Sequence, residues 1–95
     1  MAGPDERTPR AVMRLSPRDN IAVALRALKS GESVLLDGVA LTIRRNIAVG
    51  HKFAARAIAK GEIILKYSCP IGTATQAIAP GEYLHTHNVE SNYLP

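Results

Sequence analysis

The sequence predicts a small, mostly β domain with short helices, and three observations predict this class. A pattern of Ala-x-x-Ala, then Ile or Leu, two further residues, Gly and Glu occurs three times, each copy leading into a strand-like run. Asp37-Gly38 separates two apolar runs, as the central residues of a β-hairpin do. At 95 residues the chain is long enough for a single compact core. We therefore expect one domain built from short strands and three repeated, hook-shaped turns.

Residues 1–13 are expected to form a disordered leader, and residues 14–95 the domain. The first ten residues contain Pro and Gly breaks and lack an apolar segment, which argues against an ordinary secretory signal. Much of the net charge of +4 comes from four arginines in or near this leader. They are Arg7, Arg10, Arg14 and Arg18. We therefore expect no nucleic-acid partner, because such a surface would show a basic stripe interleaved with aromatic residues.

The expected elements follow in chain order. Apolar residues recur at helical spacing over Asn20–Lys29, which predicts a helix there, and a shorter helix is expected between Gly50 and Lys60. The strand-like runs are Ser33–Leu36, Val39–Ile43, Ile63–Tyr67 and Tyr83–Asn88. The glycines of the repeated pattern are expected to be turn residues, because glycine adopts positive φ without steric cost. They are Gly31, Gly61 and Gly81.

The composition indicates which residues form the core and in which cellular compartment the protein is expected. Hydrophobic residues make up 46% of the chain but aromatic residues only 4%, so Ala, Ile, Leu and Val must form the core. No run approaches the roughly 20 apolar residues of a membrane-spanning helix, and no membrane partner is expected. Cys69 is the only cysteine, so no internal disulfide can form and a cytoplasmic location is predicted.

Candidate chemistry concentrates in three histidines. His85 and His87 are separated by one residue, and on the expected strand they would share a face and present half of a metal site. The alternative is two solvated histidines on an edge strand. His51 follows a flexible glycine and would add a third nitrogen donor, although a capping or surface role is equally common. The spacing alone does not show that the three histidines meet.

Other residues would bind substrate. Asn88 would orient a substrate hydroxyl or end the strand in a turn. Lys52 and Lys66 would bind a carboxylate or remain solvated. Cys69 is more readily interpreted as a turn-lining thiol than as a nucleophile, since no base lies near it in sequence. No complete catalytic apparatus is visible, which indicates a chain that contributes to a site.

Five segments occur in an order that resembles a known family. They are Asn20–Leu25, Val49–Ala54, Ile58–Glu62, Pro70–Ala74 and Ala79–Asn88. Together they resemble the N-terminal SAF-type domain of the altronate and galactarate dehydratase family, which includes free-standing small subunits of sulfolactate sulfo-lyase. The resemblance spans Leu15 to Asn92, and its most specific parts are His-Lys-Phe and His-Thr-His-Asn.

The resemblance implies a β-clip fold and a lyase that removes water from a sugar acid such as altronate, giving a 2-keto-3-deoxy acid. It also implies a divalent metal, iron or manganese, in the full complex, and a large catalytic subunit that completes the site. This chain would deliver His85 and His87 as catalytic residues and metal ligands, together with His51. Asn88 and Lys52 would support substrate binding. The isolated chain would then be inactive and lack a complete metal sphere.

Two alternatives to a hydro-lyase subunit remain. The first is a non-catalytic SAF-like module that binds a sugar acid or a partner protein. The second is the small subunit of a sulfo-lyase, which expels sulfite in place of water. Self-association of the chain is a further expectation, since its apolar strands leave surface to cover.

Overall fold

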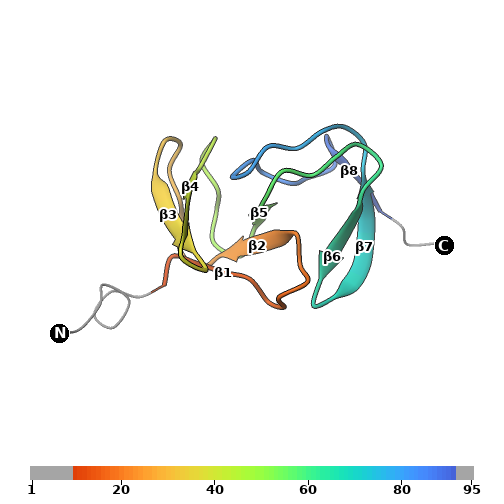
Figure 1. Cartoon of the computed structure of the whole chain (residues 1–95). Helices are drawn as coiled ribbons and strands as arrows, with labels where there is room; N and C mark the ends of the chain where they lie inside the picture. Colours follow the sequence, from red (N-terminus) through yellow and green to blue (C-terminus); the bar gives the residue numbers. More distant parts are fainter. Residues whose placement is uncertain (1–9, 92–95) are drawn as a thin grey trace.

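The computed structural model describes residues 10–91, which form eight strands in three antiparallel sheets (Figure 1). The strands are β1 (Val12–Met13), β2 (Ile21–Ala24), β3 (Ser33–Leu36), β4 (Val39–Thr42), β5 (Lys52–Ala54), β6 (Ile63–Lys66), β7 (Cys69–Ala74) and β8 (Val89–Ser91). The predicted mostly β class is confirmed. The predicted short helices are wrong, because no helix forms within the described range.

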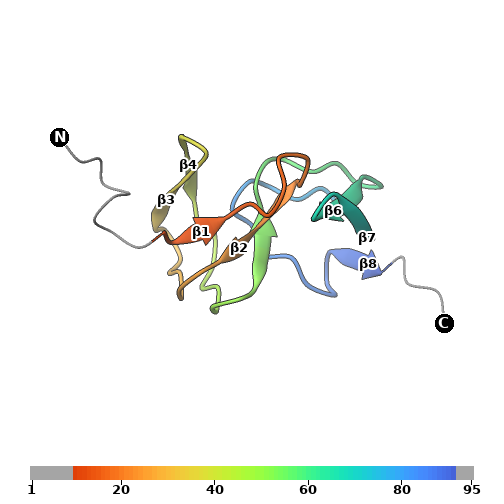
Figure 2. The same cartoon turned by 90° about the horizontal axis from the view of Figure 1, so that it is seen from below.

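The sheets are arranged around a short central one. β1, β2 and β5 form this sheet, with the β3–β4 hairpin on one side and the sheet of β6, β7 and β8 on the other (Figures 1 and 2). In the central sheet Ile21 pairs with Ala54, and Ala22 pairs with Phe53. The first pair packs into one buried cluster and the second pair into the other. The central sheet therefore carries a hydrophobic core on each face.

The prediction of a helix over Asn20–Lys29 is wrong because the strand β2 in this segment is buried on both faces. The apolar residues at helical spacing belong to a strand, β2, followed by a turn that brings Leu28 against Ile47. A strand that is buried on both faces has a nearly continuous run of apolar residues in its sequence. Hydrophobic periodicity cannot distinguish such a run from a short buried helix. The shorter helix expected between Gly50 and Lys60 is wrong for the same reason, since β5 and another turn occupy that segment.

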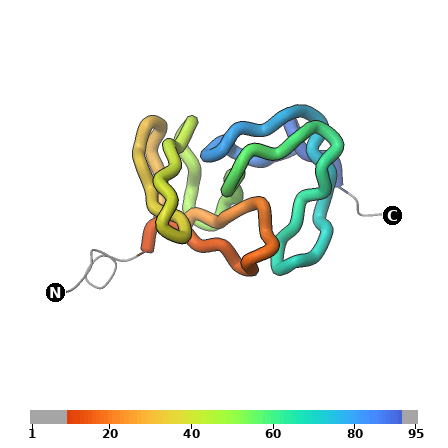
Figure 3. Tube along the Cα trace, in the orientation of Figure 1, coloured from red at the N-terminus to blue at the C-terminus, as the bar shows by residue number. Residues whose placement is uncertain are grey.

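The two halves of the domain repeat one another at an offset of about 30 residues (Figure 3). β3 and β4 are joined by Asp37-Gly38, both residues having positive φ, and the predicted hairpin is confirmed. β6 and β7 are joined in the same way by Tyr67-Ser68, with φ of 54° and 60°. These non-glycine residues are held by Asp19, whose buried carboxylate accepts both of their backbone N–H groups at 2.9 and 2.8 Å.

Four hook-shaped turns complete the repeat, one more than the sequence pattern indicates. Each hook has an apolar residue that forms an antiparallel bridge with another hook, then a glycine with φ between 81° and 86°. The bridges join Leu28 to Ile47 and Ile58 to Ile78. The glycines are Gly31, Gly50, Gly61 and Gly81. The predicted turn glycines are thus confirmed, and Gly50 belongs to an additional hook that carries His51.

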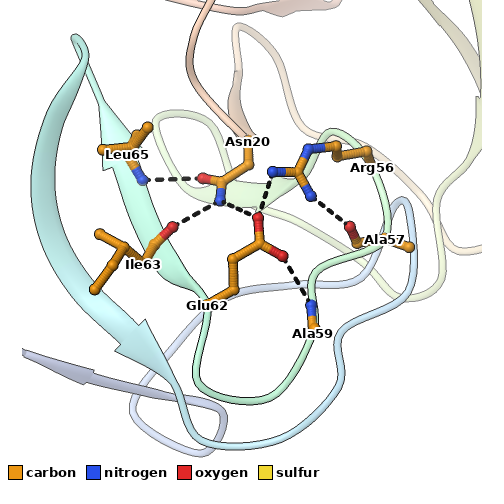
Figure 4. Close-up of polar contacts among 7 residues, drawn as sticks. All are labelled: Asn20, Arg56, Ala57, Ala59, Glu62, Ile63 and Leu65. Atoms are coloured by element: carbon orange, nitrogen blue, oxygen red, sulfur yellow. Dashed lines mark hydrogen bonds and ion pairs between the residues drawn. The ribbon is translucent and has the colours of Figure 1, made fainter.

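A buried amide ties the central sheet to the third sheet (Figure 4). The side chain of Asn20 donates to the carbonyl of Ile63 at 2.8 Å and accepts the N–H of Leu65 at 2.9 Å. It thereby bonds β6 as a neighbouring strand would. Its Nδ2 also approaches Glu62, which forms an ion pair with Arg56. Both the amide nitrogen and the amide oxygen of Asn20 therefore have hydrogen-bond partners, as buried polar groups require.

The beginning of the domain and its last strand also differ from expectation. Val12 and Met13, assigned above to the leader, form β1 and pair with β2. Arg10 and Ala11 of the predicted leader directly precede β1, and residues 1–9 lie outside the described residues. The strand expected over Tyr83–Asn88 is wrong, because residues 85–88 form a bend and a turn, and the strand that follows is β8.

Candidate functional site

The two histidines of His-Thr-His lie on a tight turn that Asn88 closes. The amide of Asn88 is fully buried, and its Oδ1 accepts the N–H of His85 at 3.0 Å. Its Nδ2 donates to the carbonyl of Tyr83 at 2.8 Å. The side chain thus satisfies backbone groups that a strand would have paired, and it closes the turn directly before β8. His85 and His87 are left exposed.

Tyr83 brings the three histidines together. The centroid of its ring lies 5.6 Å from that of His85, 5.8 Å from that of His51 and 6.2 Å from that of His87. Its hydroxyl is 2.9 Å from Nδ1 of His51. We call these four residues the histidine cluster. No sequence motif marks Tyr83 as a site residue, although it stands two residues before the first histidine of the turn.

Backbone pairing with β5 places the two halves of the cluster side by side. Tyr83 forms an isolated bridge with Phe53, and the N–H of Leu84 donates to the carbonyl of Lys52 at 3.1 Å. The turn that carries His85 and His87 therefore lies against the strand that directly follows His51. This contact joins residues more than 30 positions apart, which spacing along the sequence does not reveal.

His51 occupies the position that glutamate holds in the other three hooks. In those hooks the glutamate Oε1 accepts the backbone N–H three residues earlier, at 3.0 Å for Glu32, 3.0 Å for Glu62 and 2.9 Å for Glu82. The backbone of His51 keeps the hook geometry, donating to the carbonyl of Ala48 at 3.1 Å. Its side chain instead reaches the Tyr83 hydroxyl. The hook that departs from the repeat is thus the one that supplies His51 to the histidine cluster.

A cleft of about 440 Å³ adjoins the cluster. His85 and Thr86 line it together with two basic residues, Lys52 and Lys66. The floor is apolar and consists of Ile64, Ile71, Leu84 and Val89. Lys52 and His85, two of the predicted site residues, therefore share one cleft. Its chemistry suits a small anion whose carbon skeleton packs on the apolar floor.

The histidines do not form a metal site by themselves. Within residues 10–91 no three His, Cys, Asp or Glu side chains are grouped so as to hold a metal ion. Nδ1 of His51 is engaged by Tyr83, and Nδ1 of His85 lies 3.2 Å from the Thr86 hydroxyl. Bonding at Nδ1 orients a ring and directs Nε2 outward, as in many metal-binding histidines. Further ligands would have to come from outside the described chain.

Comparison with known proteins identifies the family. Residues 10–92 match the family model described as the altronate/galactarate dehydratase SAF domain. The chain belongs to this family of SAF domains. It is 44% identical to an altronate dehydratase of Escherichia coli over 80 residues, which is 84% of this chain. It is 36% identical over 83 residues to an altronate dehydratase of Bacillus subtilis.

This SAF domain corresponds to only a part of those dehydratases, 16% and 17% of their lengths. A second group of relatives is closer to it in size. The domain is 43% identical over 49 residues to the (2R)-sulfolactate sulfo-lyase subunit alpha of Chromohalobacter salexigens, covering 52% of that subunit. The relatives are thus named as a dehydratase and as a subunit of a sulfo-lyase. No helix among residues 10–91 of this SAF domain is long and apolar enough to span a membrane.

Proposed function

We propose that this chain is the small, SAF-type subunit of a metal-dependent hydro-lyase that dehydrates a sugar acid such as altronate to a 2-keto-3-deoxy acid. The observation that carries the proposal is the meeting of His51, His85 and His87 around Tyr83, beside a cleft with two lysines. Membership of the family and the names of the dehydratase relatives support the reaction class.

The residues of the cluster suit the proton transfers of such a dehydration. Removing water requires a base for the proton α to the carboxylate and an acid for the departing hydroxyl. A neutral imidazole of His85 or His87 would take the carbon-bound proton, and the protonated ring would be the acid. Tyr83 and His51, joined by a hydrogen bond of 2.9 Å, would pass a proton between the cluster and solvent.

The lysines would bind the acid group of the substrate. Lys52 and Lys66 line the cleft. Their ammonium groups would offset the negative charge of the carboxylate, which increases when the α proton leaves. Asn88 would act indirectly, by holding the turn that presents the two histidines. It is therefore a positioning residue in this proposal.

Of His85 and His87, the ring that does not act as the base would provide a nitrogen donor to iron or manganese, with the other ligands supplied by a large subunit. Imidazole nitrogens suit these divalent metals. A metal bound there would supply Lewis-acid stabilisation of the enediolate. The described chain offers no complete ligand set, so we propose that the site is shared and that the chain alone has no turnover. We also propose a cytoplasmic location, where the exposed thiol of Cys69 would stay reduced.

The test is co-purification of the tagged chain from its native host, with mass spectrometry of bound proteins and an assay on hexonates and sulfolactate. We expect a larger partner and a metal-dependent dehydration that chelation removes. A chain that recovers no partner and no lyase activity would contradict the proposal and favour a non-catalytic binding module. Robust dehydration by the chain alone would contradict the shared site.

A second candidate is the small subunit of a sulfo-lyase. The observation that favours it is length. The chain matches 76% of the (2R)-sulfolactate sulfo-lyase subunit alpha of Paracoccus pantotrophus, at 35% identity over 51 residues. Release of sulfite from sulfolactate, without dehydration of any hexonate, would establish this candidate in place of the first.

A further inference from the structure

One of the four hooks has an arginine without its acidic partner. In the first and third hooks an arginine lies six residues before the glutamate, and the two side chains form ion pairs. These pairs are Arg26 with Glu32 and Arg56 with Glu62. In the second hook Arg45 stands at the corresponding place, but the glutamate is replaced by His51. The basic half of the pair is kept and the acidic half is not.

The unpaired arginine lies at the histidine cluster. Its guanidinium carbon is 4.8 Å from the centroid of the Tyr83 ring, a cation–π contact. No carboxylate within the described chain forms an ion pair with it, and Arg45 is exposed. The nearest acid in sequence to Tyr83 is Glu82, whose carboxylate accepts the N–H of Ala79 at 2.9 Å. Arg45 therefore stands as an uncompensated cation beside the histidines.

We propose that Arg45 binds a carboxylate of the acid ligand at the histidine cluster. A guanidinium presents parallel N–H donors that match the two oxygens of a carboxylate, and stacking on Tyr83 would fix its plane before the ligand arrives. In two other hooks the corresponding arginine already binds a carboxylate, that of its own glutamate. In this hook the carboxylate is supplied by the ligand. The inference rests on the proposed function and adds Arg45 to Lys52 and Lys66 as a group that binds a carboxylate of the ligand.

The test uses the full chain and compares galactarate, a dicarboxylate, with galactitol, its neutral polyol. We expect saturable NMR shifts of the Arg45 side-chain N–H signals and of the histidine rings with galactarate, and none with galactitol. Arg45→Gln should weaken galactarate binding by about 10-fold or more, as expected for the loss of a charge-assisted hydrogen bond. Arg26→Gln removes an arginine from the corresponding position of another hook and should leave binding unchanged.

A second variant restores the repeat. In His51→Glu the new side chain can accept the hook N–H and pair with Arg45, as glutamate does in the other hooks. We expect this variant to fold and to lose galactarate binding, because Arg45 is then occupied by an internal carboxylate. The proposal is overturned by wild-type affinity in a folded Arg45→Gln or His51→Glu variant. Equal shifts with sodium chloride at matched ionic strength would also overturn it.

The two proposals fail in different ways. If Arg45→Gln leaves binding and the KM of an assembled lyase unchanged, Arg45 does not bind the carboxylate and the lyase function stands. If the wild-type chain binds galactarate through Arg45 but no lyase partner is found, the carboxylate site stands and the lyase function does not.

Discussion

Replacing Asn88 by alanine is expected to destabilise the domain by about 2–4 kcal/mol. The side chain is fully buried and makes two hydrogen bonds to backbone, one to the N–H of His85 and one to the carbonyl of Tyr83. Alanine leaves both backbone groups without their partner. Each group is partly shielded from water, so each loss should cost about 1–2 kcal/mol. In a domain of this size the sum corresponds to a fall in Tm of roughly 10–25 °C.

The assay is urea and thermal unfolding followed by circular dichroism, with Asn46→Ala as the control. Asn46 is exposed, and its Oδ1 accepts one backbone N–H, that of Ser30 at 2.9 Å. Its loss should cost less than about 1 kcal/mol. If Asn88→Ala is no more destabilising than Asn46→Ala, the turn does not depend on the buried amide.

Two further predictions concern the hooks. Gly81→Ala should be far more destabilising than Gly31→Ala, because both glycines have positive φ but only at Gly81 would the new Cβ lie 2.0 Å from a backbone oxygen, that of Thr42. Comparable unfolding midpoints for the two variants would contradict this reasoning. The Arg56 guanidinium lowers the pKa of Glu62 from its ordinary value of 4.5 to about 2, so the pair contributes stability above pH 4.5 that is lost as the pH falls through 2. Glu62→Gln should therefore flatten the fall in Tm between pH 5 and pH 2, and an unchanged slope would contradict it.

The sequence predicts local features of the fold well and the central sheet poorly. Asp37-Gly38 indicates its hairpin because both residues tolerate positive φ, and Ser33–Leu36 is a strand with the expected bounds. The corresponding turn at Tyr67-Ser68 lacks any such signal, since its geometry depends on the distant carboxylate of Asp19. β2 resembles a helix in sequence because both of its faces are buried, which is a property of the tertiary fold.

The candidate site is also predicted only in part from the sequence. The three histidines stand out in the sequence, but their meeting depends on Tyr83 and on the pairing of Leu84 with β5, which are long-range contacts. The position of His51 at a site where the other hooks have glutamate could have been recognised from the sequence. Arg45 and Gly50 repeat the spacing of the other hooks, and alignment of all four hooks would have shown a histidine in place of glutamate.

The functional role of the histidine cluster is tested by the dehydration rate of the assembled enzyme with each cluster histidine replaced in turn. We expect His85→Ala and His87→Ala chains to keep their Tm, because both side chains are exposed, and to retain the partner. Activity of these assemblies should fall by at least about 100-fold, as for the loss of a general acid or base. Wild-type activity in assemblies that carry either variant would show that the histidine cluster is not the functional part of this chain.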